Sequence, residues 1–136
     1  SILGPSPDFS TTMTNLSYVL KYSAGFFKPL ALVDLNGDIM HVNDAWQDTF
    51  GHSYCEATEM NAVDLSDDSL DQMELKRAMS DALYGGLVHT SIIEGLKRTG
   101  VVFPCEVQIV PLYGGLSEEA DIRHFVMIYD PFPLPA

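Results

Sequence analysis

The chain has 136 residues, enough for one domain with a single core, and 46% of them are hydrophobic. No apolar run approaches the ~18 residues that a membrane-spanning helix needs, and no signal-peptide pattern is present. Nineteen Asp and Glu against seven Lys and Arg give a net charge of −12. This charge excludes a nucleic-acid-binding surface and a membrane-bound one, because both require basic side chains. We expect a cytoplasmic piece of a longer protein, whose acidity serves its solubility.

A flanking helix is predicted within residues 1–26, after a loose leader over residues 1–7. Ser6 followed by Pro7 is typical of a helix start, and Gly25 of a helix end. Apolar residues recur along this segment at helical spacing and form one stripe: Phe9, Met13, Leu16 and Leu20. The stripe either covers the sheet of its own domain or contacts a partner, and both arrangements satisfy the pattern.

A hairpin is predicted next. Strands over Leu30–Leu35 and Ile39–Val42 flank the pair Asn36-Gly37. This pair is typical of a type I′ turn, because both residues tolerate the positive φ that the turn requires.

A short helix follows the hairpin directly. Asn43 or Asp44 offers a side-chain oxygen as its N-cap, and Gly51 is a plausible end in the left-handed conformation. Trp46 and Phe50 lie one turn apart on this helix and are expected to share a face.

One or two short helical turns are predicted within residues 52–68, followed by a longer helix. Ser69–Gln72 reads SLDQ, a capping-box pattern that marks the start of that helix. The pair Gly85-Gly86 marks its end. Its apolar face is formed by residues spaced three and four apart: Leu75, Ala78, Met79, Ala82 and Leu83.

Three further strands are predicted, over Leu87–Ile93, Val101–Leu112 and Ile122–Tyr129. The order is therefore helix, two strands, helices, three strands. This order favours an α+β fold, an antiparallel sheet with helices gathered on one face.

The chemistry-bearing residues do not assemble into a catalytic or metal-binding motif. Cys55 and Cys105 have no metal-ligand spacing; we expect free thiols, with a single disulfide as the alternative. His41 and His124 are expected at the surface or edge of neighbouring strands, and His52 is expected to be exposed. No nucleophile elbow or HExxH sequence occurs. We therefore expect the domain itself not to be an enzyme, with an attached effector domain left open.

Short motifs follow one another at a characteristic spacing. D-x-x-G-x-I spans residues 34–39, N-x-A spans 43–45 before Gly51, and Lys97-Arg98-Thr99-Gly100 forms a later hairpin turn. In this order the chain resembles a PAS domain, a small sensory and interaction module of signalling proteins. The resemblance covers roughly Pro29 to Phe132, within a PAS-like domain over 27–132 that a linker follows at 133–136. Asp130-Pro131-Phe132 departs from the Asp-Ile-Thr that the family often carries there.

The resemblance implies the architecture. A five-stranded antiparallel sheet in the order 2-1-5-4-3 would carry helices over one face, and these helices would close a cavity. The N-terminal flanking helix would lie outside this unit.

The resemblance also bears on flavin. The flavin-adduct segment of light-sensing relatives aligns with Asn61-Ala62-Val63-Asp64, so that Ala62 stands where those proteins carry the reactive Cys. Their flavin-contacting Asn and Gln align with Cys105 and Tyr129. We therefore expect no photoadduct chemistry and no flavin.

Haem is the remaining cofactor alternative. Haem-binding relatives often place a ligand His on the long helix, but residues 69–86 contain none. His89, just after that helix, is the one candidate axial ligand and would make the domain a gas or redox sensor. We expect no bound cofactor and no metal.

Two functions remain open for the domain. The first is a sensor whose pocket binds a small apolar ligand, such as a fatty acid or an aromatic metabolite. The second is an interaction module with a filled core, and in either case we expect a homodimer and a flanking effector domain. The dimer-interface candidates are Phe9, Met13, Leu16 and Leu20. The pocket candidates are Trp46, Phe50, Ala62, Met79, Leu83, Cys105, Val107, Ile109, Phe125, Met127 and Tyr129.

Overall fold

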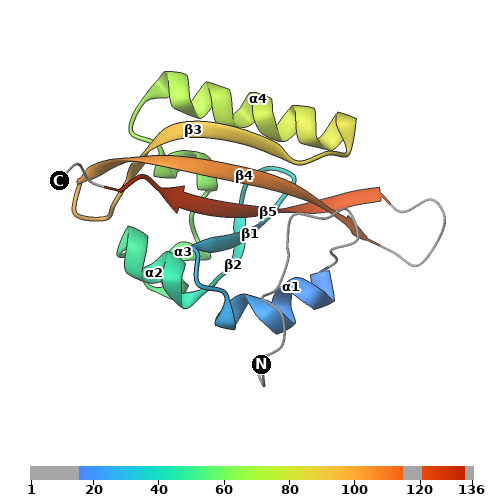
Figure 1. Ribbon diagram of the computed structural model, residues 1–136, viewed down its shortest axis with the longest axis horizontal. Helices are drawn as coiled ribbons and strands as arrows, with labels where there is room; N and C mark the ends of the chain where they lie inside the picture. The colour runs from blue at the N-terminus through green and yellow to red at the C-terminus, as the bar shows by residue number, and fades with distance from the viewer. Residues whose placement is uncertain (1–15, 115–120, 134–136) are drawn as a thin grey trace.

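The structure is a computed structural model, and it describes residues 16–114 and 121–133. Its sheet has five strands in the order β2-β1-β5-β4-β3, with every neighbouring pair antiparallel, as the sequence predicts. In chain order the elements are α1 Leu16–Tyr22, η1 Ser23–Gly25, β1 Leu30–Asp34, β2 Ile39–Val42, α2 Asp44–Phe50, α3 Tyr54–Ala57, η2 Ala62–Leu65, α4 Ser69–Gly85, β3 His89–Leu96, β4 Val102–Gly114 and β5 Asp121–Pro131. Figure 1 shows α4 beside β3 and α1 at the opposite end of the molecule.

The central strands are buried on both faces. Along β5, Phe125 and Met127 join the apolar cluster that also contains residues of α2, α3 and α4, whereas Val126 and Ile128 join a second cluster. Val19 of α1 belongs to this second cluster and is fully buried there. The unbroken apolar run along β5 is the sequence signal for burial on both faces.

The apolar stripe predicted for the N-terminal helix is only partly buried. Leu16 packs against the second cluster beside the buried Val19, whereas Leu20 is 50% exposed. α1 therefore covers its own sheet through Leu16, which belongs to the predicted stripe, and through Val19, which does not. Phe9 and Met13, like the predicted leader, lie outside the described residues.

The β1–β2 turn is not the predicted type I′ turn. Among the described residues only glycines have positive φ, so Gly37 adopts φ 91° while Asn36 does not. The Gly37 N–H donates to the Asp34 carbonyl at 3.0 Å, and the Asp34 N–H donates to the Asp38 carbonyl at 3.0 Å. This pattern is a type I turn closed by a left-handed glycine. Asp34 Oδ1 also accepts from the Asn36 and Asp38 N–H groups, which ends β1 one residue earlier than predicted.

The N-cap of α4 is one residue earlier than the sequence predicted. Asp68 is the N-cap, because its Oδ1 accepts from the Leu70 N–H at 2.7 Å, so the capping box predicted from Ser69 is wrong. Gln72 instead donates its side-chain amide to the Ser66 carbonyl at 3.0 Å. The predicted apolar face is otherwise confirmed, with Leu83 the only member that is partly exposed.

The β3–β4 hairpin is longer than predicted. β3 extends to Leu96, because Glu94, Gly95 and Leu96 pair with residues 102–104 of β4. The tight turn over Lys97–Gly100 leaves these residues free to join the ladder. It repeats the geometry of the first hairpin, with a left-handed glycine at φ 90° in its last position.

Candidate ligand-binding cleft

Asn43 positions the helix that carries two of the predicted pocket residues. Its Oδ1 accepts from the Trp46 N–H at 2.9 Å and from the Leu30 N–H at 3.0 Å. Its Nδ2 donates to the Lys28 carbonyl at 2.9 Å, and the residue is 2% exposed. Of the two predicted caps, Asn43 is therefore the one that acts, and it ties the start of α2 to β1.

Aromatic rings on α2, β4 and β5 meet beneath the helices. The Phe50 ring lies 4.9 Å from Trp46, 5.0 Å from Tyr129 and 5.5 Å from Phe103, measured between ring centroids. Trp46, Phe50 and Tyr129 are all fully buried. Phe103 was missing from the predicted set, although its alternation with Cys105 along the strand placed it on the same face.

Buried polar atoms in this cluster have few partners. The Tyr129 hydroxyl donates to Met127 Sδ at 3.5 Å, and burial raises the pKa of Tyr129 well above its usual range. Burial also raises the pKa of Cys105 to about 12, so this thiol stays neutral and unreactive near pH 7. Trp46 Nε1 is buried and faces the Tyr129 hydroxyl without forming a hydrogen bond of good geometry. Cys55 is exposed and both cysteines are free, so the disulfide alternative is wrong.

These residues do not fit a flavin. Ala62, at the adduct position, is fully buried and has no thiol. Cys105 donates to the neighbouring Glu106 carbonyl at 3.4 Å, and Tyr129 offers a single hydroxyl that already faces Met127. A flavin ring edge would leave several of its polar atoms unpaired here, at about 1–3 kcal/mol each.

The structure brings the predicted pocket residues together. All of them belong to the apolar cluster under the helices or pack against it: Trp46, Phe50, Ala62, Met79, Leu83, Cys105, Val107, Ile109, Phe125, Met127 and Tyr129. Most are closed off from solvent as core side chains. Leu83 on α4 is the exception, and it marks the place where the cluster opens.

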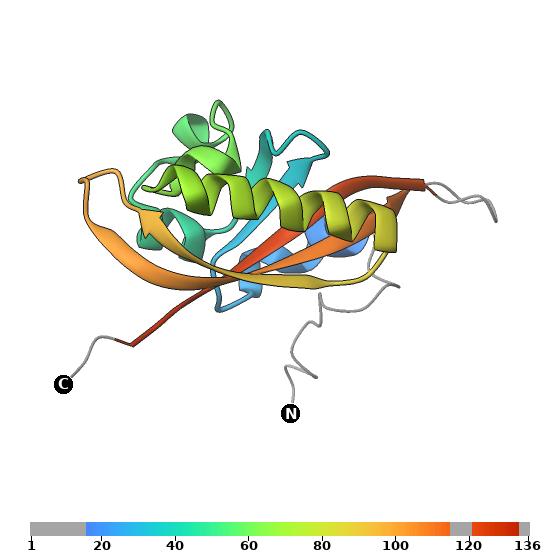
Figure 2. The ribbon, with the colours of Figure 1, turned by 90° about the horizontal axis from the view of Figure 1, so that it is seen from above.

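An open cleft of about 310 Å³ lies between α4 and the β1–β2 turn. In Figure 2 this hairpin rises beside α4 on the same side of the sheet. Three predicted pocket residues line the cleft: Met79, Leu83 and Phe125. The lining residues that the sequence did not indicate are Leu35, Asn36, Val63, Lys76, Ser80 and Tyr84. Nothing local marks them, because they come from elements that meet only in the folded chain.

A larger and shallower hollow adjoins the cleft. Its volume is about 680 Å³, and it shares Leu35, Leu83 and Tyr84 with the cleft. Its other lining includes Asp121 and Arg123, whose charged groups lie 3.8 Å apart.

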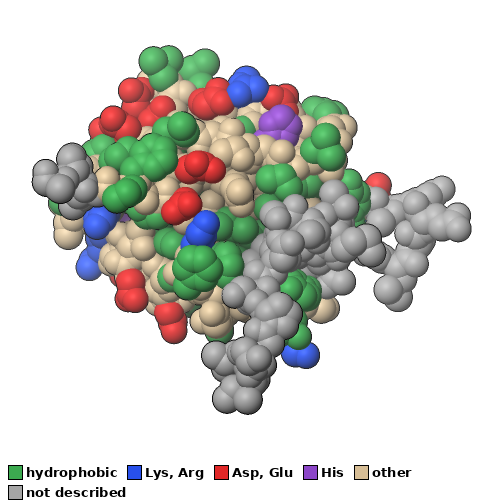
Figure 3. All heavy atoms as spheres, in the orientation of Figure 1, with side chains coloured by type: hydrophobic (Ala, Val, Ile, Leu, Met, Phe, Trp, Pro, Cys, Tyr) green, Lys and Arg blue, Asp and Glu red, His purple; other side chains and the backbone are tan. Residues whose placement is uncertain are grey.

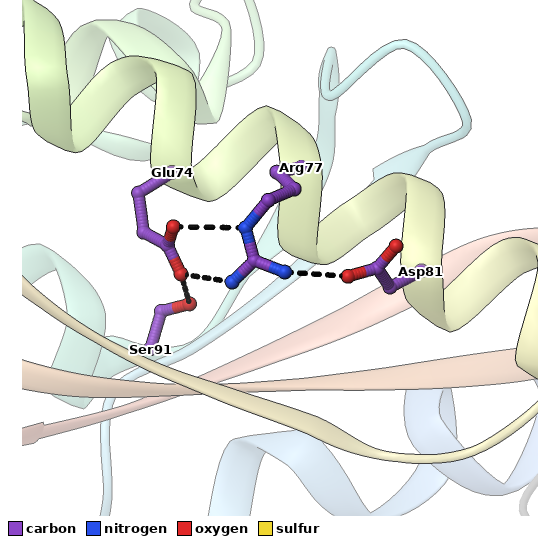
Figure 4. A network of polar contacts seen from close by, with 4 residues as sticks. All are labelled: Glu74, Arg77, Asp81 and Ser91. Atoms are coloured by element: carbon purple, nitrogen blue, oxygen red, sulfur yellow. Dashed lines mark hydrogen bonds and ion pairs between the residues drawn. The ribbon is translucent and has the colours of Figure 1, made fainter.

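The α4 wall of the cleft is tied to the sheet by a polar network, drawn in Figure 4. Arg77 pairs with both Glu74 and Asp81 along the helix, and Glu74 accepts from the Ser91 hydroxyl of β3 at 3.3 Å. The hydrogen bond from Arg77 holds the pKa of Glu74 below its usual value. The pairs are exposed and individually weak. Only the Glu74–Ser91 hydrogen bond joins α4 to β3, so the buried apolar face of α4 sets which side of the helix lies toward the sheet.

The histidines do not converge. His41 contacts the Ser23 hydroxyl and the Tyr54 hydroxyl at 2.9 Å each, and burial lowers its pKa. His52 was predicted to be exposed, but its side chain is only 15% exposed. The ring packs near that of Trp46, and its Nδ1 lies 3.9 Å from Glu56 Oε2. Within residues 16–114 and 121–133, no group of three or more His, Cys, Asp or Glu side chains is placed to hold a metal ion.

His89 and His124 lie on different strands. His89 is partly exposed at the start of β3 and pairs with Ile109, on the face that it shares with the buried Ser91. His124 is partly exposed on β5 opposite Leu112.

The surface is mainly acidic, as the composition predicts. Figure 3 shows acidic side chains scattered over the face drawn, with few basic ones among them. None of the described helices is both long enough and apolar enough to cross a bilayer.

A family model described as PAS fold matches residues 28–128. The chain therefore belongs to the PAS family of sensory and interaction modules found in signalling proteins. The family match confirms the resemblance seen in the sequence. No curated protein matches the chain significantly.

Solved structures with the same fold are distant in sequence. A PAS domain from Colwellia psychrerythraea has a TM-score of 0.74 at 21% identity, over 86% of this chain and 96% of that one. The PAS domain of the fruit-fly ELK potassium channel has a TM-score of 0.69 at 20% identity, over 87% and 97%. A PAS domain from a two-component sensor histidine kinase has a TM-score of 0.64 at 14% identity, over 85% and 95%. At these identities the likeness concerns the fold alone.

Proposed function

We propose that this PAS domain senses a small apolar ligand that binds in the cleft between α4 and the β1–β2 turn. One observation carries the proposal: Met79, Leu83 and Phe125, predicted as pocket residues, line an open cavity of about 310 Å³. Small-molecule pockets occupy roughly 300–1,000 Å³ and are mostly apolar. The role is regulatory, and the domain itself supplies no catalysis.

β5 offers a route from the cleft to the rest of the protein. Phe125 lines the cleft, and the same strand continues to Pro131 near the C-terminal end. Beyond it, the Phe132 N–H donates to the Pro104 carbonyl at 3.0 Å. A ligand against Phe125 would therefore bias the strand that leads into a flanking effector domain. A cytoplasmic location belongs to this proposal and is supported by the two free thiols.

The test is to search for a bound or binding molecule. The purified protein is analysed by native and denaturing mass spectrometry, and a library of fatty acids, alcohols and aromatic metabolites is screened by thermal shift. We expect at least one apolar compound to stabilise the protein, because binding to the folded state raises its stability. Leu83→Trp, which fills the cleft, should abolish the shift.

Leu20→Trp is the matched control, because it makes the same change on the exposed face of α1. Both variants are first checked for cooperative unfolding. If no compound stabilises the parent protein, the sensor proposal is wrong.

The exposed apolar residues on α1 and just after it favour a second candidate function, a homodimerising interaction module. Leu20 is 50% exposed, Tyr22 40% and Phe27 73%. A dimer that buries them should be weakened in the double variant Leu20→Ser, Phe27→Ser, measured by light scattering across a concentration series. Leu70→Ser, at a 70% exposed position on α4, is the control. A parent protein that stays monomeric throughout the series would remove this candidate.

A further inference from the structure

The lining of the cleft carries a positive charge, whereas the chain as a whole is strongly negative. The whole sequence has nineteen acidic and seven basic residues. The residues that line the cleft include one basic residue, Lys76, and no acidic one. A cavity in so acidic a protein that is free of carboxylates does not repel an anion at close range.

Within the described residues, Lys76 is also the one Lys or Arg side chain without an acidic or aromatic partner. All seven basic residues lie in the described part of the chain, and Lys28, Arg77, Arg98 and Arg123 form ion pairs with acidic side chains. The remaining two lysines other than Lys76 lie over aromatic rings. Among the described residues, the Lys76 ammonium alone has neither an acidic nor an aromatic partner.

Ser80 adds a second donor at the same edge. Lys76 and Ser80 lie four residues apart on α4, so their side chains are neighbours on one face of the helix, and both line the cleft. An ammonium and a hydroxyl side by side can both donate to one carboxylate. The apolar side chains of Val63, Met79 and Phe125 line the same cavity.

The adjoining hollow offers no comparable unpaired cation among its lining residues. Arg123 lies there, but its guanidinium is 3.8 Å from the Asp121 carboxylate, which would repel a second anion. We therefore expect the charged end of a ligand to bind at Lys76 and its apolar part to lie toward Leu83.

We infer that the ligand of this cleft is an amphipathic monocarboxylate, a medium-chain fatty acid, whose carboxylate pairs with Lys76 and whose chain lies against Met79, Leu83 and Phe125. This inference rests on the proposed sensor function and adds the chemical class of its ligand. A cavity of about 310 Å³ is at the lower end of ligand-binding sizes, which suits a chain of medium length.

The experiment compares decanoate with decanol, which has the same chain without the charge, by titration calorimetry on the full chain at low salt. We expect decanoate to bind more tightly than decanol and to lose this advantage as salt is raised. In Lys76→Gln the affinity for decanoate should fall about 3- to 10-fold, while that for decanol stays unchanged. Lys76→Arg should keep most of the affinity for decanoate.

Lys97→Gln is the matched control, because it removes the same charge at the β3–β4 turn, away from the cleft lining. If decanol binds as tightly as decanoate, or if Lys76→Gln loses no more than Lys97→Gln, the carboxylate inference is wrong and the sensor proposal stands. If decanoate binds less tightly than decanol, the inference is likewise wrong. If neither compound binds, the inference is wrong, and the outcome of the wider library screen decides the sensor proposal separately.

Discussion

Asn43 connects three segments of the chain through one buried side chain. Its oxygen accepts from the N–H groups of Leu30 and Trp46, and its nitrogen donates to the carbonyls of Ser23 and Lys28. A shorter side chain leaves these backbone groups unpaired in the protein interior. At the residue scale we therefore expect a small change at Asn43 to cause a large loss of folding stability.

Asn43→Ala is expected to lower the free energy of unfolding by about 2–4 kcal/mol, because buried backbone groups lose their partners. Asp48→Ala, at an exposed position of the same helix, should change it by no more than about 0.5 kcal/mol. Chemical denaturation of both variants measures the difference. Equal stabilities would show that Asn43 does not hold β1 and α2 together.

Gly37 combines positive φ with a close neighbour. Its φ is 91°, and a Cβ added there would lie 2.9 Å from Asn61 Oδ1. Gly37→Val should therefore destabilise the domain by about 1–3 kcal/mol through backbone strain, with a further loss from the contact. Gly100→Val is the control, because its φ is 90° but its surroundings are open. Thermal unfolding should rank Gly37→Val below Gly100→Val, and an unchanged Tm for Gly37→Val would contradict the turn geometry.

At the scale of the element, α1 belongs to the domain and not only to a linker. It covers the face of the sheet opposite α4, where Val19 is fully buried beside Leu30, Leu32 and Val126. β3, by contrast, alternates between buried and exposed residues, because no described helix covers its outer side. The helix therefore protects one part of a sheet that otherwise would expose apolar residues.

Two neighbouring residues of α1 test this role. Val19→Ala should cost about 1–3 kcal/mol, because it leaves a cavity against the sheet. Leu20→Ala removes a larger side chain but should cost no more than about 0.5 kcal/mol in the monomer, since half of it faces water. Urea unfolding at low protein concentration compares them. A larger loss for Leu20→Ala would mean that α1 packs with a different face.

At the scale of the whole molecule, the closed aromatic core argues against a coloured cofactor. Ala62, Cys105 and Tyr129 offer little to a flavin, and His89 lies at the edge of the sheet, where it is partly exposed. The cleft, where Met79, Leu83 and Phe125 lie beside Lys76, instead suits a small apolar or amphipathic ligand.

We therefore expect the freshly purified protein to be colourless, with no absorbance in the flavin or haem bands. An absorbance spectrum from the near ultraviolet through the visible range measures this directly. A yellow preparation, or a Soret band that disappears in His89→Ala, would contradict our account of the interior.

The sequence by itself determined the order of the elements, narrowed the cap of α2 to Asn43 or Asp44, and determined the inward faces of α4, β4 and β5. These features depend on neighbours a few residues away, through hydrogen bonds of caps and turns and through the periods of strand and helix. Even here a competing local partner moved a boundary, as Asp34 did for β1 and Asp68 for α4.

Only the tertiary structure decided which side of α1 is buried and where the core opens. Val19 rather than Leu20 faces the sheet because the rotation of a helix about its axis is set by what packs against it, and both residues are apolar. The cleft is the space left between α4, the β1–β2 turn and Phe125, which lie far apart in the chain. This space and the position of Lys76 at its edge depend on how distant elements pack. A local sequence pattern cannot predict that packing.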